Sequence, residues 1–303
     1  MASPAEALPM TSTPAPGRRY VDADGVWHKQ RIVSVTLYWG IHAACLLTLV
    51  TGVSALDLGL CVGLFWLRMF GITGGYHRYF AHRAFQTSRA FQFVLAVLGT
   101  MAVQKGPLWW ASTHRVHHRN SDQPGDVHSP RDGFWHSHSA WIFDGRWDDT
   151  DLDGIRDFAK FPELVWLNQW HVVGPLLLAV LCFAIGGFSG LIWGFAVSTT
   201  LLWHSTYTIN SLAHRWGSKR YETGDDSRNN LFLALLTFGE GWHNNHHHYM
   251  ASARNGFFWW EIDITYYLLR GLEKLGLVWE LRIVPKRLLH ARRVRVGDLR
   301  EAA

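Results

Sequence analysis

The sequence predicts an all-α membrane protein with four transmembrane helices, arranged as two hairpins, and a cytosolic helical cap. Three observations support this fold class. First, 48% of the 303 residues are apolar and 17 are Trp, a composition typical of chains that cross a bilayer and place aromatic rings at its interfaces. Second, apolar residues gather in long runs. Third, nearly all basic residues and all clustered histidines lie between or beyond the hairpins.

The apolar runs are four candidate spans, at about residues 32–56, 58–75, 172–186 and 191–209. A helix needs roughly 20 apolar residues to cross a bilayer, so the third run is short. The first two runs are separated only by a tight turn near Asp57. The last two are separated only by the glycine-rich stretch Gly186-Gly187-Phe188-Ser189-Gly190. Each close pair therefore predicts a helical hairpin.

Lysine and arginine indicate the orientation. Of the 29 basic residues, four lie in residues 1–31, ten in residues 76–171, fourteen from residue 210 onward and one at Arg68. Under the positive-inside rule, both termini and the long middle segment are cytoplasmic. Arg68 is expected to snorkel toward the cytoplasmic end of its helix. This distribution by membrane side also argues against nucleic acid as a partner of the basic residues.

The remaining segments complete the predicted domain organisation. Residues 1–30 begin with a Pro-, Ala- and Ser-rich stretch and are expected to form a disordered cytosolic segment. The main domain is 31–285, and its cap comprises residues 76–171 and 210–285. Within the cap, the apolar run 90–103 is too short to span and predicts an interfacial or re-entrant helix. Residues 286–303 are expected to be a basic cytosolic tail, either on anionic headgroups or solvated.

Eight histidines form three clusters, and all three fall on the cytoplasmic side. The first cluster reads H-x4-H and the other two read H-x-x-H-H; their members are His77 and His82, then His114, His117 and His118, then His243, His246 and His247. Positions i, i+3 and i+4 share one face of an α-helix, so each triplet converges. His77 and His82 are about 140° apart on a regular helix, so their convergence requires a bend.

The number of histidines predicts a metal site. Any single histidine is more often a polar core or surface residue than a ligand, but eight in three clusters indicate metal binding. One ion cannot use eight imidazoles, so the clusters predict two metals. His214 lies four residues after Asn210, on the same helical face, at the end of the fourth span. It is either a further ligand or an interfacial histidine beside a capping Asn.

The ligand type narrows the choice of metal. A zinc hydrolase uses about three protein ligands and one water per ion, so the clustered histidines are too many for one zinc. Two irons with four or five neutral imidazoles each fit the number and keep positions open for dioxygen. Glu240 precedes His243 by three residues, but a lone carboxylate equally binds an Arg or caps a helix. The clusters therefore differ from the carboxylate-rich sites of soluble di-iron bundles.

At this point the motifs resemble those of the integral-membrane fatty acid desaturases, most closely the delta-9 acyl-CoA branch. The matching text runs from Gly71 to His247 and reads GITGGYHRYFAHR, WWASTHRVHH, DVHSPRDGFWHSH, NSLAH and GEGWHNNHH. The resemblance implies two iron ions (Fe²⁺), O2 as co-substrate, Asn210 as a ligand through a water, and no catalytic side chain beyond the ligands. The implied histidine ligands are His77, His82, His114, His117, His118, His214, His243, His246 and His247.

The implied reaction removes two hydrogens from an unactivated acyl chain, using O2 and two electrons, and leaves a cis double bond and two waters. No side-chain acid or base deprotonates a methylene, so the part left to the protein is positioning. The resemblance assigns Gln104, Trp110 and Thr206 to the bend of a narrow substrate tunnel. The alternative interpretation is that each of these three residues is a structural residue at the membrane interface.

The expected partners are an acyl-CoA or another acyl substrate, the lipid bilayer and an electron donor. An acyl carrier would be anionic, and its candidate contacts are Lys105, Arg115, Arg119 and Arg131, each of which equally suits a solvated or lipid-facing role. The sequence contains no His-Pro-Gly-Gly haem motif. Electrons are therefore expected to come from a separate carrier, such as ferredoxin, rubredoxin or cytochrome b5.

Two other functions fit parts of the sequence. One is a histidine-cluster hydroxylase or ketolase, which inserts oxygen instead of removing a second hydrogen; the short first cluster and the NSLAH element favour desaturation. The other is a metal-transporting membrane protein. Transporter ligands should lie near the bilayer midplane on spanning helices, whereas these clusters are expected at the cytoplasmic ends.

Overall fold

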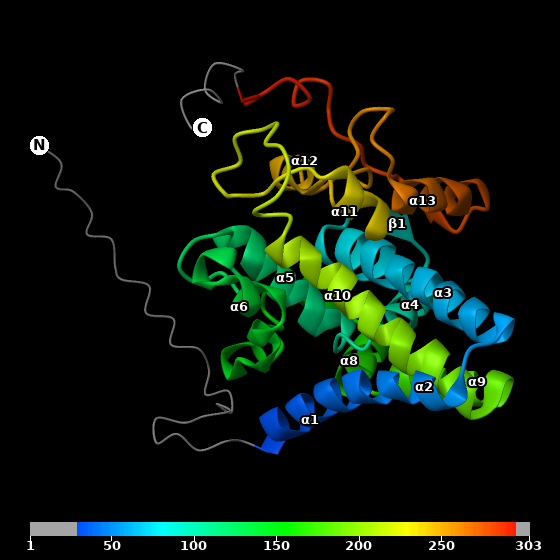
Figure 1. The fold of residues 1–303 in the computed structure, drawn as a ribbon. Coiled ribbons are helices and arrows are strands. Elements are labelled where there is room, and N and C mark those ends of the chain that lie inside the picture. Colours follow the sequence, from blue (N-terminus) through cyan, green and yellow to red (C-terminus); the bar gives the residue numbers. More distant parts are fainter. Residues whose placement is uncertain (1–28, 295–303) are drawn as a thin grey trace, which may run out of the picture.

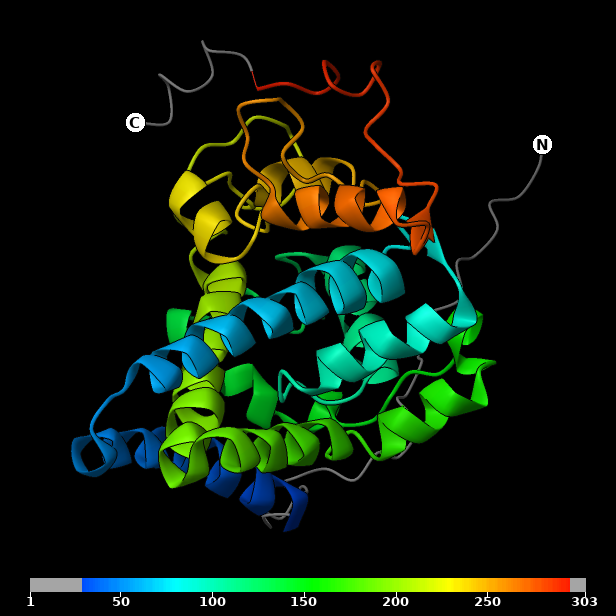
Figure 2. The same cartoon turned by 90° about the vertical axis from the view of Figure 1, so that its right-hand side faces the viewer.

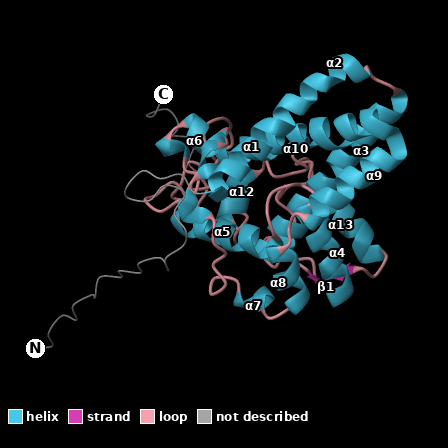
Figure 3. Ribbon diagram, turned by 90° about the horizontal axis from the view of Figure 1, so that it is seen from below, coloured by secondary structure: helices cyan, strands magenta, loops and turns pink. Residues whose placement is uncertain are grey.

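The computed structural model describes residues 29–294, which form a helical molecule with one short strand pair (Figures 1 and 3). All but the last two positions of the predicted disordered segment 1–30 lie outside the described residues. Within residues 29–294, three helices are long and apolar enough to cross a membrane: Val33–Thr51, Ala55–Ala81 and Val173–Ser211. The third is 39 residues long and covers two of the four predicted spans.

The first predicted hairpin forms, with its turn slightly earlier than expected. Its helical segments are α1 (Lys29–Ala44), η1 (Cys45–Leu47), α2 (Thr48–Thr51) and α3 (Ala55–Phe70). The sequence predicted the turn near Asp57, but the chain turns at Gly52, where φ is +68°. The Ser54 Oγ accepts the backbone N–H of Asp57, and the Asp57 carboxylate accepts that of Ser54 at 2.9 Å. This capping box draws Asp57 into the first turn of α3.

The second hairpin lies within the 39-residue helix. Its segments are α9 (Val173–Gly190), the π-helical η6 (Leu191–Val197) and α10 (Ser198–Ser211). Twelve residues of straight helix would separate Cys182 from Gly194 by about 18 Å. Instead, a Cβ built on Gly194 would lie 2.9 Å from the Cys182 Sγ. The chain therefore folds back at Gly187, which has a non-helical φ of +61°.

Arg68 does not snorkel, which corrects the sequence-based expectation. Its side chain is fully buried, and its guanidinium donates to the hydroxyls of Ser198 at 2.6 Å and Thr199 at 2.7 Å. It also donates to the backbone carbonyls of Leu64 and Met101. The physical reason is that the bundle supplies enough acceptors for the charged group, so that it need not reach water.

The cap is built from shorter elements on both sides of the second hairpin. Before it come β1 (Gln86–Thr87), α4 (Arg89–Thr100), α5 (Pro107–Asn120), η3 (Pro130–Asp132), α6 (Phe134–His138), η4 (Ala140–Phe143), η5 (Gly145–Trp147), α7 (Arg156–Ala159) and α8 (Pro162–Gln169). After it come α11 (Leu231–Leu236), α12 (His243–His248), α13 (Ile264–Lys274) and β2 (Val278–Trp279). The two strands pair antiparallel. The last three helices gather at the end of the molecule opposite α1, α2 and α9 (Figures 1 and 2).

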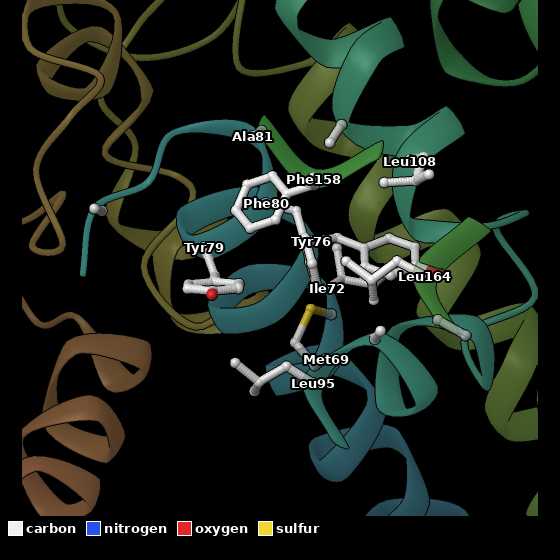
Figure 4. Close-up of a cluster of buried hydrophobic side chains, with 14 of the residues drawn as sticks. Met69, Ile72, Tyr76, Tyr79, Phe80, Ala81, Leu95, Leu108, Phe158 and Leu164 are labelled. Atoms are coloured by element: carbon white, nitrogen blue, oxygen red, sulfur yellow. The ribbon is translucent and has the colours of Figure 1, made fainter. Parts of the chain in front are cut away.

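The core surrounds η2 (Gly71–Ala81), a π-helical continuation of α3 in which every residue is buried. Figure 4 shows its side chains among those of α4, α5, α7 and α8, including Leu95, Leu108 and Phe158. The predicted short apolar helix is α4, whose Leu95 and Ala96 are fully buried. A Cβ on Gly99 would meet the ring of Tyr76 at 2.0 Å, so glycine permits this close contact.

The described part of the predicted basic tail packs on the cap. The backbone N–H of Glu222 donates to the Arg292 carbonyl at 2.8 Å, and the Val294 N–H donates to the Arg220 carbonyl at 3.0 Å. The Tyr221 hydroxyl donates to the Leu289 carbonyl. Residues 286–294 are thus tied to the protein, whereas residues 295–303 lie outside the described part.

Close packing at the second hairpin predicts a stability difference between two glycines. Gly194→Val would force a side chain against Cys182, and overpacking of this kind costs about 1–3 kcal/mol. Gly63→Val is the matched control, because a Cβ at Gly63 meets nothing within 4 Å. We expect a lower thermal unfolding midpoint in detergent for the first variant only. Equal midpoints for the two variants would contradict the hairpin packing.

Candidate metal centre

The clustered histidines come from four elements that meet in the cap. His77 and His82 lie at the end of η2, and three further histidines project from α5. His214 follows the end of α10, and the last cluster opens α12. Figure 1 shows α5, α12 and the end of α10 next to one another. Segments far apart in the sequence thus bring imidazoles to one place.

The nine histidines form two groups. The first comprises His77, His82, His114, His118 and His246, and the second comprises His117, His214, His243 and His247. Within each group, one ring nitrogen from every member lies within 4.8 Å of all the others. His214, which the spacing alone left open, belongs to the second group. The structure therefore gathers every histidine that was predicted to be a ligand, and the division into five and four could hold two ions.

The π-helix explains how the first cluster converges. A π-helix closes i→i+5 hydrogen bonds, so residues five apart lie on one face. The backbone N–H of His82 donates to the carbonyl of His77 at 3.2 Å, which is such a bond. Their ring centroids are 4.8 Å apart. The bend that the sequence required is thus a widening of the helix.

The nitrogens of the first group contact one another in a chain. The Nε2–Nε2 distances are 3.0 Å for His77–His246, 2.9 Å for His246–His118, 3.0 Å for His118–His114 and 3.0 Å for His114–His82. A neutral imidazole nitrogen carries either one proton or one in-plane lone pair. The three central nitrogens each have two such neighbours and cannot hydrogen-bond to both. A cation among the lone pairs resolves this conflict.

These distances also indicate the coordination geometry. At metal–nitrogen distances of roughly 2.0–2.1 Å, ligands at right angles lie about 2.9 Å apart, whereas tetrahedral ligands lie about 3.3 Å apart. The observed 2.9–3.0 Å matches right angles. In the second group, the Nε2 atoms of His214 and His243 are also 3.0 Å apart. The buried Nε2 atoms of His117 and His247 have no hydrogen-bond partner. The arrangement suits ions with five or six ligands better than tetrahedral zinc.

Four buried carboxylates contact the opposite ring nitrogens. The Nδ1–oxygen distances are 2.8 Å for His117–Asp126, 2.7 Å for His214–Asp122, 2.7 Å for His247–Asp225 and 2.7 Å for His77–Glu240. A carboxylate on Nδ1 fixes the tautomer and orients Nε2 toward a metal. Sequence reasoning missed the three aspartates. It expected Glu240 to bind an Arg or to cap a helix, and Glu240 does pair with Arg78 at 3.2 Å in addition to its contact with His77. Asp122 and Asp126 follow the second cluster closely, which is the one local signal that pointed to them.

Burial keeps the imidazoles available as ligands. Desolvation lowers the pKa of His82, His114, His118, His243 and His246 well below 6.5, so their Nε2 lone pairs are not protonated near neutral pH. Burial also lowers the pKa of His247 to about 4, against the opposing hydrogen bond to Asp225. Burial alone would raise the pKa of Asp225, but the hydrogen bond from His247 offsets it and the net shift is downward. A neutral imidazole paired with an anionic carboxylate results.

A cavity that is partly open to solvent adjoins both histidine groups. Its walls include Met69, Ile72 and Trp141 as well as the ligand candidates His77, His114 and His243. Asn210 also lines it. A mostly apolar cavity with a few polar groups is typical of a small-molecule site. The cavity could therefore hold an apolar chain beside the two metal positions.

The three residues predicted for the substrate tunnel line this cavity and bond to one another. The Gln104 amide nitrogen donates to the Thr206 hydroxyl at 2.9 Å, and the Trp110 indole N–H donates to the Gln104 carbonyl oxygen at 3.2 Å. These bonds join α10, α5 and the turn between α4 and α5. The triad is thus a rigid part of the cavity wall.

The cations expected to contact an anionic carrier are mostly paired already. Lys105 lies 2.8 Å from Asp148, Arg115 2.9 Å from Asp157 and Arg131 2.9 Å from Asp226. Arg119 is exposed, without a carboxylate within 4.0 Å among residues 29–294. The free cationic surface is therefore smaller than the sequence suggested, because nearby aspartates neutralise three of the four side chains.

Comparison with known proteins identifies relatives over most of the chain. The model of the family described as fatty acid desaturase matches residues 53–279. The chain is 37% identical over 269 residues to acyl-CoA 5-desaturase of Anemone leveillei, covering 85% of this chain and 81% of that protein. It is 38% identical over 266 residues to delta-9 acyl-lipid desaturase 1 of Arabidopsis thaliana, covering 85% of each. It is 35% identical over 258 residues to sn-1 stearoyl-lipid 9-desaturase of Anabaena variabilis, covering 84% and 95%.

The carboxylate contacts predict an effect on metal affinity without removal of any histidine. Asp126→Asn keeps the shape but weakens the bond from His117, and loss of such an orienting group costs about 10–100-fold in affinity. Metal retained during titration with a chelator is the measurement. Asp153→Asn is the control, because Asp153 is 84% exposed and contacts only the exposed Arg156. Equal retention by both variants would show that Asp126 does not orient a ligand.

Proposed function

The chain belongs to the fatty acid desaturase family, and from this premise we propose that it introduces a cis double bond at the delta-9 position of a saturated acyl chain, using O2. As a member of that family it is an oxidoreductase, and its apolar helices indicate a membrane protein. The observation that carries the proposal is the pair of histidine groups beside an apolar cavity. Relatives named for the ninth carbon support the bond position.

Two iron ions are the proposed cofactor. His77, His82, His114, His118 and His246 would hold one, and His117, His214, His243 and His247 the other, with Asn210 reaching an ion through a water. The neutral imidazoles and the right-angle spacing of their nitrogens fit iron. The buried Nε2 atoms of His117 and His247 have no hydrogen-bond partner in the protein, so they are available as ligands. With O2, bound iron supplies an oxidant able to remove hydrogen from an unactivated methylene.

The chain's own residues position the substrate and the ligands. The reaction consumes O2, two electrons, two protons and two substrate hydrogens, and yields one alkene and two waters. Gln104, Trp110 and Thr206 would fix the bend of the acyl chain against the cavity wall, where apolar neighbours exclude water. Asp122, Asp126 and Asp225, which accept hydrogen bonds from Nδ1, hold their imidazoles in the orientation that aims Nε2 at the metal.

The proposal includes the membrane arrangement and the partners expected from the sequence. Four spans, in two hairpins that reverse at Gly52 and Gly187, would leave both termini and the cap in the cytoplasm. The acyl carrier is CoA, as the 37% identity to an acyl-CoA 5-desaturase supports, and Arg119 is the cation left to meet it. Electrons come from a separate donor such as ferredoxin, rubredoxin or cytochrome b5.

Expression in a host that lacks its own delta-9 desaturase tests the activity. We expect rescue of growth without added unsaturated fatty acid, and a double bond at the ninth carbon when products are mapped by mass spectrometry. Purified enzyme with a reduced ferredoxin or cytochrome b5 should act on saturated acyl-CoA; product only from lipid-bound chains would reassign the carrier. A hydroxylated product without alkene would favour a hydroxylase instead.

Removal of one histidine tests the iron assignment. His117→Ala deletes an Nε2 that has no protein partner, so we expect loss of one of the two irons and of all measurable turnover. Iron is measured by elemental analysis of the purified protein. His136→Ala is the control, because His136 belongs to neither histidine group. Full iron content with full turnover in His117→Ala would refute the ligand role.

A further inference from the structure

The turn between α4 and α5 is strained. Val103 has φ of +57° and Lys105 has φ of +61°, and neither is glycine. Such conformations cost about 1–3 kcal/mol each and persist only where the surroundings hold them. The residue between them is Gln104, which lines the cavity and bonds to Thr206. The turn thus presents a cavity residue from a backbone that needs outside support.

Side chains from three other helices support this turn through its carbonyl groups. Arg68 donates to the Met101 carbonyl at 3.3 Å. The Trp203 indole N–H donates to the carbonyls of Ala102 at 3.1 Å and Val103 at 3.2 Å. The Tyr76 hydroxyl donates to the Lys105 carbonyl at 3.0 Å. Irregular backbone inside a membrane protein must have its polar groups satisfied by the protein, and these donors do so.

Arg68 is the charged member of this support. It lies in the candidate span Ala55–Ala81, is fully buried, and has no carboxylate within 4.0 Å among residues 29–294. A buried, unpaired guanidinium in such a helix is costly, and residues of this kind usually have a functional role. Here, the cost is offset by four hydrogen bonds to neutral acceptors. Three of these acceptors lie on neighbouring segments, so Arg68 joins α3, α10 and the turn.

The turn at residues 101–105 is joined to α10 by two sets of contacts, one after the other along the helix. Arg68 bridges Met101 and Thr199, and Gln104 bonds to Thr206. Thr199, which accepts from Arg68, and Thr206, which accepts from Gln104, are seven residues apart and therefore share one face of α10. Along the turn, Met101 and Gln104 follow the same order. Arg68 thus makes the first set of contacts, at Met101 and Thr199, and the Gln104–Thr206 bond is the second. Loss of the contact between Arg68 and Met101 would therefore shift the turn and move Gln104 along the cavity wall.

We infer that Arg68 is a positioning residue for regiochemistry, which holds the turn at residues 101–105 so that Gln104 fixes which acyl carbons face the metal centre. The inference rests on the proposed desaturase function. It assigns Arg68 no contact with substrate or iron. Its effect passes through the Met101 carbonyl and the turn to the Gln104–Thr206 bond.

Product analysis of Arg68 variants tests this role. Arg68→Met removes all the donors at similar length, and Arg68→Lys keeps the charge but not the fork that joins three segments. A misplacement of about 1 Å can cost roughly 100-fold in rate, so we expect the ratio of the main to the neighbouring double-bond isomers to fall about tenfold in Arg68→Met and less in Arg68→Lys. Arg89→Ala, at the exposed start of α4, should keep the wild-type ratio.

Isomer ratio and iron content together separate positioning from plain stability. An Arg68→Met protein with normal iron, lower yield and an unchanged ratio would overturn the inference. If Arg68 variants fail to accumulate, Trp203→Phe decides, because it removes the donor to Ala102 and Val103 while keeping a ring. A shifted ratio in that variant supports control by the turn, and an unchanged ratio overturns it. Wild-type protein that makes no alkene would instead refute the proposed function.

Discussion

Nine imidazole nitrogens must approach one another without carrying protons, and most of the cap follows from this requirement. Within the first group the Nε2 atoms are 2.9–3.0 Å apart, a spacing that charged imidazolium rings would not tolerate. Burial keeps most of the rings neutral, and carboxylates such as Asp225 hold Nδ1 so that the opposite nitrogen faces inward. Helices from distant parts of the chain are therefore fixed relative to one another by the two histidine groups to which they contribute side chains.

The sequence was sufficient to predict that the histidines of the second cluster lie on one helical face, and likewise those of the third. The reason is that positions i, i+3 and i+4 share a face on any α-helix. It also predicted the short helix α4 and the two hairpins, whose apolar lengths follow from composition. It predicted that His77 and His82 need a bend in order to converge, but it could not show that the bend is a π-helix, because no local pattern distinguishes a π-helix from an α-helix.

Long-range polar pairing was the other part that the sequence could not supply. Asp225 meets His247 across 22 residues, and Asp122 meets His214 across 92, so neither carboxylate has a signal near its partner. The same holds for Lys105 and Asp148, whose pairing removed a cation from the expected carrier site. Arg68 was assigned to the interface because its acceptors on α10 lie about 130 residues away along the chain. Apolar patterns are visible within a short stretch of sequence, so they predict helices. These polar pairs form only once distant segments have come together in the fold.

The π-helix at Gly71–Ala81 also couples the backbone shape of this segment to its histidine spacing. In an ordinary α-helix, two residues five apart lie about 140° from each other around the axis, whereas two residues four apart share one face. The five-residue spacing of His77 and His82 therefore brings their imidazoles together only while the segment stays π-helical, and a change that narrowed the helix here would disperse the first histidine group without altering a single ligand.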